Sequence, residues 1–154
     1  MMFRLERGVT GFWGKNDPEP PRVDVRMFRG GCHAAALAAG GTVESIDEAV
    51  YPRGYHTAVV ATPENRAGIL CHAGYPLIAF VADSAASWLE PRMFRDSPAW
   101  AEAFAERGFT VMGRELLESP LTAVDTSALT KAEWRQIHGW KATTVGETVF
   151  NGWD

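Results

Sequence analysis

The chain has little cysteine and no long apolar run. Two cysteines in 154 residues do not form the dense disulfide framework of a small secreted protein, so we expect reduced thiols. The longest uncharged run, Ala67 to Ala82, falls short of the ~20 residues that cross a bilayer and is broken by Pro76. The start, Met1–Gly14, lacks the apolar core of a secretory signal. These features predict a cytoplasmic protein with no membrane partner.

The sequence also lacks a surplus of positive charge and the common catalytic patterns. Its formal net charge is −4, whereas nucleic-acid-binding domains are usually basic, so we expect no nucleic-acid partner. The dinucleotide-binding G-x-G-x-x-G, the P-loop, G-x-S-x-G, H-E-x-x-H and the zinc-deaminase signature are all missing. The sequence therefore predicts no catalytic residue, no metal ligand and no cofactor.

The residues that are present fit one α+β domain over residues 1–154. A hydrophobic fraction of 46% is typical of globular chains. Apolar residues three and four apart, among them Phe28 and Cys32, predict a helix from near Asp24 to Ala39 that ends at Gly40-Gly41.

Strand patterns fill the middle of the chain. Short β-branched and apolar runs, separated by turns such as 51–55 and 62–66, predict strands at Thr42–Ile46, His56–Ala61, Ala67–His72 and Leu77–Ala82. The last three form an antiparallel meander over 56–82. Two of them are apolar on successive residues, which predicts cover on both faces. Further strands are predicted at Phe3–Trp13 and Phe109–Met112.

Helix signals dominate the remainder. Ser97 as N-cap and Gly108 past the end delimit one helix, and residues 113–119 suggest another. Two Thr-x-x-Glu capping boxes, at 130–133 and 144–147, start two more, one stopping at Gly139 and one reaching Trp153. The sequence thus predicts an antiparallel sheet packed by N-terminal and C-terminal helices.

Cysteine and histidine are adjacent twice, as Cys32-His33 and Cys71-His72. Neighbouring side chains diverge on a helix and oppose each other on a strand, so each pair offers at most one ligand to a shared metal. A Cys nucleophile with a histidine base is the alternative enzyme or metal-binding reading, and Cys71 is its candidate. The apolar run around Cys71 disfavours a thiolate and favours a small buried hydrophobe.

Two groups of residues are candidates for contact with another protein. One is acidic and precedes a turn: Glu44, Asp47 and Glu48. The other is apolar and follows the meander: Trp88, Met93 and Phe94. Large aromatic side chains and Met are enriched at interface centres, and acidic side chains steer basic partners. The acidic group is also compatible with a solvated surface, and Trp88 is equally compatible with a lid over the core.

Both ends of the chain show a resemblance. Gly11-Phe12-Trp13-Gly14, followed by a polar proline-rich loop, is similar to the first strand of some immunity proteins of bacterial polymorphic-toxin systems. Residues 136–141, 144–147 (TVGE) and 150–154 (FNGWD) resemble the ending of small bacterial proteins. The resemblance implies a non-catalytic domain, monomeric or homodimeric, that binds and neutralises a cognate protein toxin.

Overall fold

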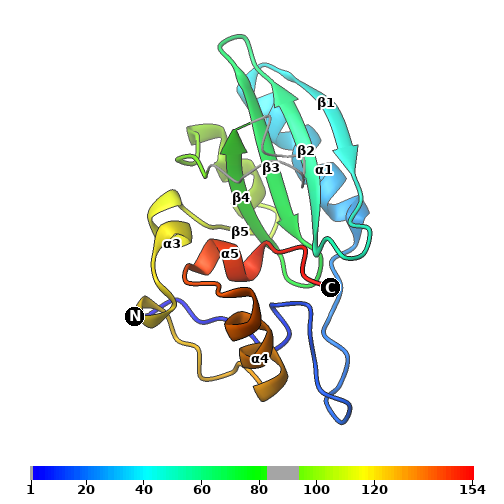
Figure 1. Cartoon of the computed structure of the whole chain (residues 1–154). Helices are drawn as coiled ribbons and strands as arrows, with labels where there is room; N and C mark the ends of the chain where they lie inside the picture. Colours follow the sequence, from blue (N-terminus) through cyan, green and yellow to red (C-terminus); the bar gives the residue numbers. More distant parts are fainter. Residues whose placement is uncertain (1, 83–93) are drawn as a thin grey trace.

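The computed structural model describes residues 2–82 and 94–154 and has the α+β fold expected from the sequence. Within these residues five strands form one sheet, in the order β1-β2-β3-β4-β5 (Figure 1). The strands are β1 Thr42–Asp47, β2 Tyr55–Ala61, β3 Arg66–His72, β4 Leu77–Ala82 and β5 Thr110–Val111. Strands β1 to β4 pair antiparallel, whereas the short β5 joins β4 in parallel. The predicted meander is confirmed.

Helix α1, Val25–Ala39, covers one face of the sheet (Figure 1). Its first turn is capped by the Asp24 carboxylate, which accepts a backbone hydrogen bond of 2.9 Å. It ends at Gly40, whose φ of 69° suits glycine. Inside the helix, Gly31 lets Phe104 approach closely, since a Cβ there would lie 2.9 Å from the ring. The predicted helix and its end are confirmed.

Alternate residues of β3 point into two different hydrophobic clusters. Cys71 lies on the side of the sheet that α1 covers, whereas Leu70 points to the opposite side. We call the first cluster the α1 face; it includes Phe28, Cys32, Ala58, Val60, Ile69, Cys71, Ile78, Phe80 and Phe104. We call the second the C-terminal face; it includes Leu5, Val9, Tyr55, Leu70, Ala79, Val81, Met112, Leu117, Ile137, Val145, Val149 and Phe150. Both central strands, β3 and β4, are therefore covered on two faces, as predicted.

The chain after residue 94 contributes to both faces. The remaining elements are η2 Ala99–Ala101, α2 Glu102–Ala105, α3 Arg114–Glu118, η3 Leu121–Ala123, α4 Lys131–Trp140 and α5 Val145–Val149. Elements η2 and α2 contact α1, whereas α3 contacts α5 beyond the opposite side of the sheet. In Figure 1 the N-terminal segment runs beside α4 and α5, below the sheet. None of the helices in the described segments has the length and apolarity needed to cross a bilayer.

The prediction of a strand over Phe3–Trp13 is wrong. This segment makes an isolated bridge between Arg4 and Asp125 and does not join the sheet. Gly8 and Gly11 have φ values of 87° and 85°, in the left-handed region, which interrupts any extended run. Instead, Leu5 and Val9 are buried in one cluster with residues of the C-terminal helices, whereas Trp13 at the end of the segment is exposed.

Three predicted helix ends also move. Instead of starting with a Ser97 cap, the 3₁₀ turn η2 has Pro98 at its N-cap and leads into the short α2. Helix α4 continues through Gly139 to Trp140. Helix α5 stops four residues before Trp153, because Phe150 leaves the helical region at φ −111° and ψ 74°.

Candidate functional site: an aromatic cavity beside an acidic hollow

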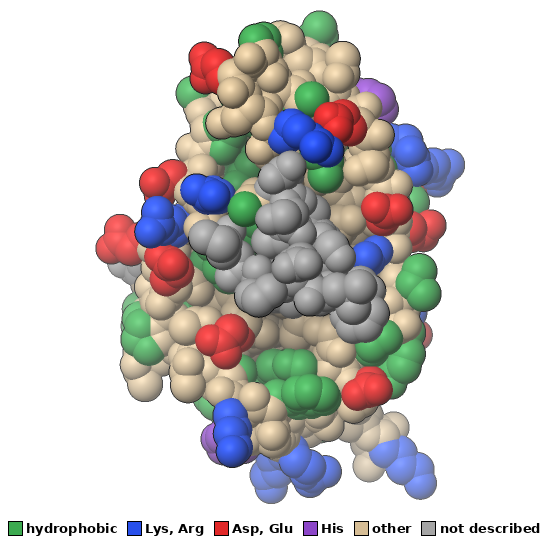
Figure 2. All heavy atoms as spheres, turned by 45° about the horizontal axis from the view of Figure 1, so that its top comes forward, with side chains coloured by type: hydrophobic (Ala, Val, Ile, Leu, Met, Phe, Trp, Pro, Cys, Tyr) green, Lys and Arg blue, Asp and Glu red, His purple; other side chains and the backbone are tan. Residues whose placement is uncertain are grey.

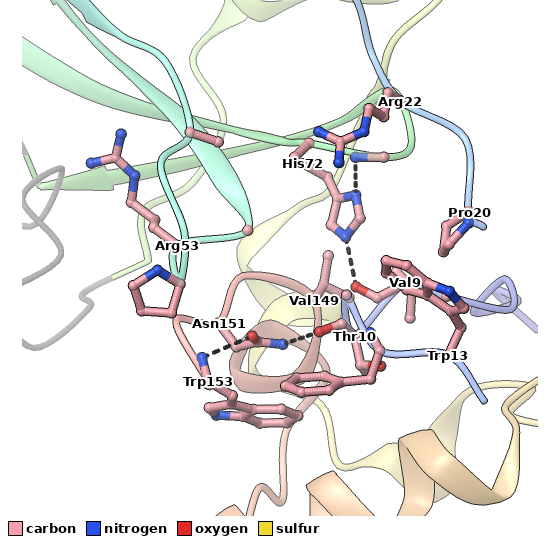
Figure 3. A pocket seen from close by; sticks show the side chains of 18 of the residues that line it. Val9, Thr10, Trp13, Pro20, Arg22, Arg53, His72, Val149, Asn151 and Trp153 are labelled. Atoms are coloured by element: carbon pink, nitrogen blue, oxygen red, sulfur yellow. Dashed lines mark hydrogen bonds between the residues drawn. The ribbon is translucent and has the colours of Figure 1, made fainter. Parts of the chain in front are cut away.

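A cavity of about 290 Å³ opens at the end of the sheet where β3 leads into the turn towards β4. Segments far apart in sequence line it: residues 8–13, 19–22, 51–54 and 72–74, together with Ala49, Val149, Asn151 and Trp153. Figure 3 shows Arg22, Pro20 and Trp13 on one side of the cavity and Arg53, Asn151 and Trp153 on the other. Aromatic and proline side chains therefore form much of its wall.

His72 ties the N-terminal segment to the sheet at this cavity. Its Nδ1 accepts hydrogen bonds from the backbone N–H of Gly74 at 2.9 Å and of Tyr75 at 3.0 Å. Nδ1 therefore carries no proton, and Nε2–H donates to the Val9 carbonyl at 2.6 Å (Figure 3). Burial lowers the pKa of His72 to about 4, although the bond to Val9 opposes the shift. The ring is neutral at pH 7 and serves as an anchor.

Glu133 anchors the same N-terminal segment from the opposite direction. Its fully buried carboxylate accepts hydrogen bonds from Gly8 N at 2.9 Å and from the Thr10 hydroxyl at 2.7 Å and backbone N at 3.2 Å. It also accepts from Thr130 N at 3.2 Å, which completes the capping box that starts α4. One side chain thus both caps a helix and positions one wall of the cavity.

Asn151 links three segments that line the cavity: the N-terminal segment, the turn before β2 and the C-terminal end of the chain. Its amide donates to the Thr10 carbonyl at 3.0 Å and to the Thr148 carbonyl at 2.8 Å, and its side-chain oxygen accepts from Trp153 N at 3.2 Å. The Asn151 carbonyl accepts from Gly54 N at 3.0 Å. These contacts also account for the early end of α5, since Asn151 turns the chain back towards the N-terminal segment. The cavity is therefore held in shape by buried hydrogen bonds.

Large aromatic side chains surround the mouth of the cavity. Trp153 lies between Phe12, at 6.5 Å between ring centroids, and Trp140, which stacks on it at 6.2 Å with 5° between the planes. Trp13 is 43% exposed and Tyr51 is 80% exposed. Because Trp13, Tyr51 and Trp153 line the same cavity, their exposed surface gathers in one place, which marks a candidate interaction surface.

A separate acidic hollow of about 530 Å³ shares with the cavity the turn that Tyr51, Pro52 and Arg53 form. Asp47 and Glu48 line it, together with Val50 and the same turn. The Arg53 guanidinium is held against the chain, donating to the carbonyls of Glu48 at 2.7 Å and Tyr55 at 3.0 Å. The turn therefore separates an aromatic cavity from a hollow with two carboxylates.

The structure brings together only part of the predicted acidic group. Asp47 and Glu48 are both exposed and share the acidic hollow. Glu44 lies further along β1, where it forms an ion pair of 2.8 Å with Arg66. Charged side chains of both signs are interspersed over the face seen in Figure 2.

Of the predicted apolar group Trp88, Met93 and Phe94, only Phe94 lies within the residues that the structure describes. Trp88 and Met93 lie outside the described residues. Phe94 is partly buried, its ring lies 6.5 Å from Phe150, and it contacts the position of Gly146 in α5. A role for these residues in binding a partner stays a prediction.

Both thiols lie in the core of the α1 face. Cys32 and Cys71 are free and have no exposed surface. Burial raises the pKa of both, that of Cys32 to about 12, and an environment of this kind disfavours a reactive thiolate. As alternation requires, Cys71 and His72 face opposite sides of β3. In the described segments no three His, Cys, Asp or Glu side chains are arranged to hold a metal ion.

Sequence reasoning did not identify Trp13, Tyr51 and Trp153 as parts of one site. They come from the two ends and the middle of the chain, and no local pattern joins them. The available signals were indirect: the resemblance drew attention to both ends, and the capping box drew attention to Glu133. Neither indicated that Glu133 bonds to residues 8–10.

Comparisons with protein-family models, curated proteins and solved structures find no match to this chain.

Proposed function

We propose that this protein is a non-catalytic protein-binding domain of the immunity type, which binds a cognate bacterial toxin in the cytoplasm and neutralises it. The observation that carries the proposal is the aromatic cavity with its exposed Trp13 and Tyr51. Trp, Tyr and Arg are the residue types that supply most of the binding energy at protein interfaces, and the cavity lining contains all three.

The acidic hollow is an argument that the partner is basic. Asp47 and Glu48 are exposed beside the cavity, and the whole chain carries a net charge of −4. Complementary charge around an apolar contact speeds association more than it strengthens binding. An inhibitor that must meet its toxin before damage occurs benefits from a fast association of this kind.

The decisive experiment is a growth rescue. The reading frame adjacent to this gene in its native genome is expressed from an inducible promoter, alone or together with this protein. The proposal expects that the neighbouring product arrests growth and that co-expression restores it. The two proteins should then co-elute as one complex in size-exclusion chromatography. A neighbouring product that arrests growth equally with and without this protein would contradict the proposal.

Charge reversal tests the electrostatic part with the purified pair. Asp47→Lys with Glu48→Lys should slow association at low salt by about tenfold, because steering depends on net complementarity. Glu102→Lys with Glu106→Lys, at exposed positions in and just past α2, changes the net charge by the same amount; this matched control should leave the association rate within about twofold. Equal rates for all variants would remove the electrostatic part and leave the apolar contact standing.

A further inference from the structure

The size and lining of the aromatic cavity favour a protein side chain as its occupant. At about 290 Å³ it lies at the lower limit of cavities that enclose drug-sized ligands, roughly 300–1,000 Å³. The buried polar groups that meet there are already used: both nitrogens of His72 and all side-chain polar atoms of Asn151 have partners. A ligand therefore meets apolar surface from Trp13, Tyr51 and Trp153, beside the exposed Arg22 guanidinium, which lies 3.5 Å from the Glu19 carboxylate.

The cavity is also formed before any ligand arrives. Its N-terminal wall is held by His72, Glu133 and Asn151 through hydrogen bonds that span 63 to 141 residues of sequence. Gly8 packs against Pro20, leaving no room for a Cβ, so the proline-rich loop is braced as well. A rigid cavity spares the partner the cost of ordering it, which favours tight docking of one anchor side chain.

The turn at residues 51–53 determines what should flank that anchor. A segment that crosses Tyr51 leaves the aromatic cavity and enters the acidic hollow. Two carboxylates, Asp47 and Glu48, line it together with one guanidinium, that of Arg53, which is already bonded to two backbone carbonyls. The hollow therefore attracts a cationic side chain of the partner. It disfavours a carboxylate of the partner, because its only guanidinium is already bonded.

We propose that the cavity and the hollow together bind one extended segment of a partner protein, which inserts a large apolar side chain between Trp13 and Trp153 and places a Lys or Arg over Asp47 and Glu48. This proposal rests on the protein-binding function above and specifies the partner's epitope. It moves the apolar contact from the predicted Trp88–Phe94 group to the aromatic cavity.

A phage-displayed library of random 12-residue peptides, selected on the full-length protein, tests this directly. The selected peptides should share a Trp, Phe or Leu with a Lys or Arg within a few residues of it. Trp13→Ala and Tyr51→Ala should each weaken a synthetic copy of the best peptide at least tenfold. Asp47→Asn with Glu48→Gln should weaken it three- to tenfold and reduce its salt dependence.

Two controls separate binding from folding. Leu37→Ala removes an apolar side chain on α1 that is 83% exposed, and it should leave peptide affinity unchanged. Thermal unfolding of the Trp13 and Tyr51 variants should match that of the parent, because both side chains are substantially exposed. Should Trp13→Ala unfold, Tyr51→Ala carries the test on its own.

Three results overturn the proposal: no enriched peptide, enriched peptides that are acidic, or peptides whose affinity is unaffected by the Trp13 and Tyr51 substitutions. Growth rescue distinguishes this failure from failure of the proposed function. If co-expression rescues growth but no peptide is enriched, the immunity function stands and the partner binds another part of the surface. If peptides with the expected residues are enriched but growth is not rescued, the binding site for the segment stands and the adjacent toxin is excluded as the protein that supplies it.

Discussion

The two faces of the sheet are held together by different kinds of interaction. On the α1 face, aromatic, aliphatic and small side chains interlock, with Phe104 in contact with Phe28, Phe80 and Phe109 at centroid distances of 5.9 to 6.3 Å. On the C-terminal face, Glu133 and Asn151 are also buried, and each bonds to Thr10. One face is a hydrophobic core with a single buried histidine, His56, stacked on Phe28, whereas the other is an assembly of distant segments joined by polar contacts.

This contrast explains where the candidate site lies. Close packing on the α1 face comes from a helix lying on strands, with fully buried side chains from both. Hydrogen bonds on the other face hold irregular segments at fixed positions without filling the space between them. The aromatic cavity is one of the spaces that remain on this face, and its shape depends on Glu133, His72 and Asn151.

The largest expected effect is on the α1 face. Phe104→Ala removes a fully buried ring and should lower the free energy of unfolding by about 4 kcal/mol, since aromatic truncations in cores cost roughly 3–5 kcal/mol. Chemical denaturation measures the change. A loss under about 1 kcal/mol would mean that the face repacks easily, which contradicts the close packing described here.

The next effect concerns the polar anchor of the other face. Glu133→Ala leaves Gly8 N–H and both donors of Thr10 unpaired, and should cost about 3 kcal/mol at about 1 kcal/mol or more for each buried donor. Glu147 gives a matched control, because it occupies the same third helical position after Thr144 in α5 but is exposed. Glu147→Ala should cost no more than about 1 kcal/mol. Equal losses would show that Glu133 acts through its capping box alone.

A pH effect of similar or smaller size should come from His72. Its pKa falls from an ordinary 6.5 to about 4 because of burial, so the unfolded chain binds a proton at a higher pH than the folded chain does. Stability is therefore complete above pH 6.5 and declines as the pH falls towards 4, by up to roughly 3 kcal/mol. The pKa of His56 is lowered in the same direction by desolvation, so both faces contribute to this decline.

Substitution isolates the contribution of His72. His72→Gln should remove most of the loss between pH 6.5 and 4, whereas His33→Gln, at an exposed position on α1, should leave the profile unchanged. Unfolding free energies measured across this range provide the test. An unaltered slope in His72→Gln would mean that the ring is protonated in the folded protein, against the tautomer that its hydrogen bonds require.

The same contrast separates what the sequence could predict from what it could not. Helix α1 and strands β1 to β4 follow from local periodicity, and their bounds differ from the predicted ones by no more than one residue. Periodicity works there because each element buries a continuous stripe or alternating face. Fold class and the central meander follow from these elements directly.

Prediction failed where a segment's environment is set by distant residues. Phe3–Trp13 has enough apolar residues for a strand, but its backbone donors bond to Glu133, more than 120 residues away. Likewise, α5 stops early because Asn151 bonds to Thr10. The candidate site consists almost entirely of such segments, which is why no local pattern located it.

The smallest expected effect is on the rate of thiol labelling at pH 7. This rate tests whether the two faces of the sheet open together. Cys32 and Cys71 should resist an alkylating reagent in the native protein and react once it is unfolded, because both are fully buried. We expect the native labelling rate to be set by local opening of α1, because α1 packs on β1, β2, η2 and α2, whereas Glu133 bonds to Gly8 and Thr10. Glu133→Ala should therefore change that rate by less than about threefold, although it removes about 3 kcal/mol of global stability. A rate increase of about a hundredfold would instead follow the global equilibrium. It would show that the two faces, despite their different interactions, unfold as one unit through the strands they share.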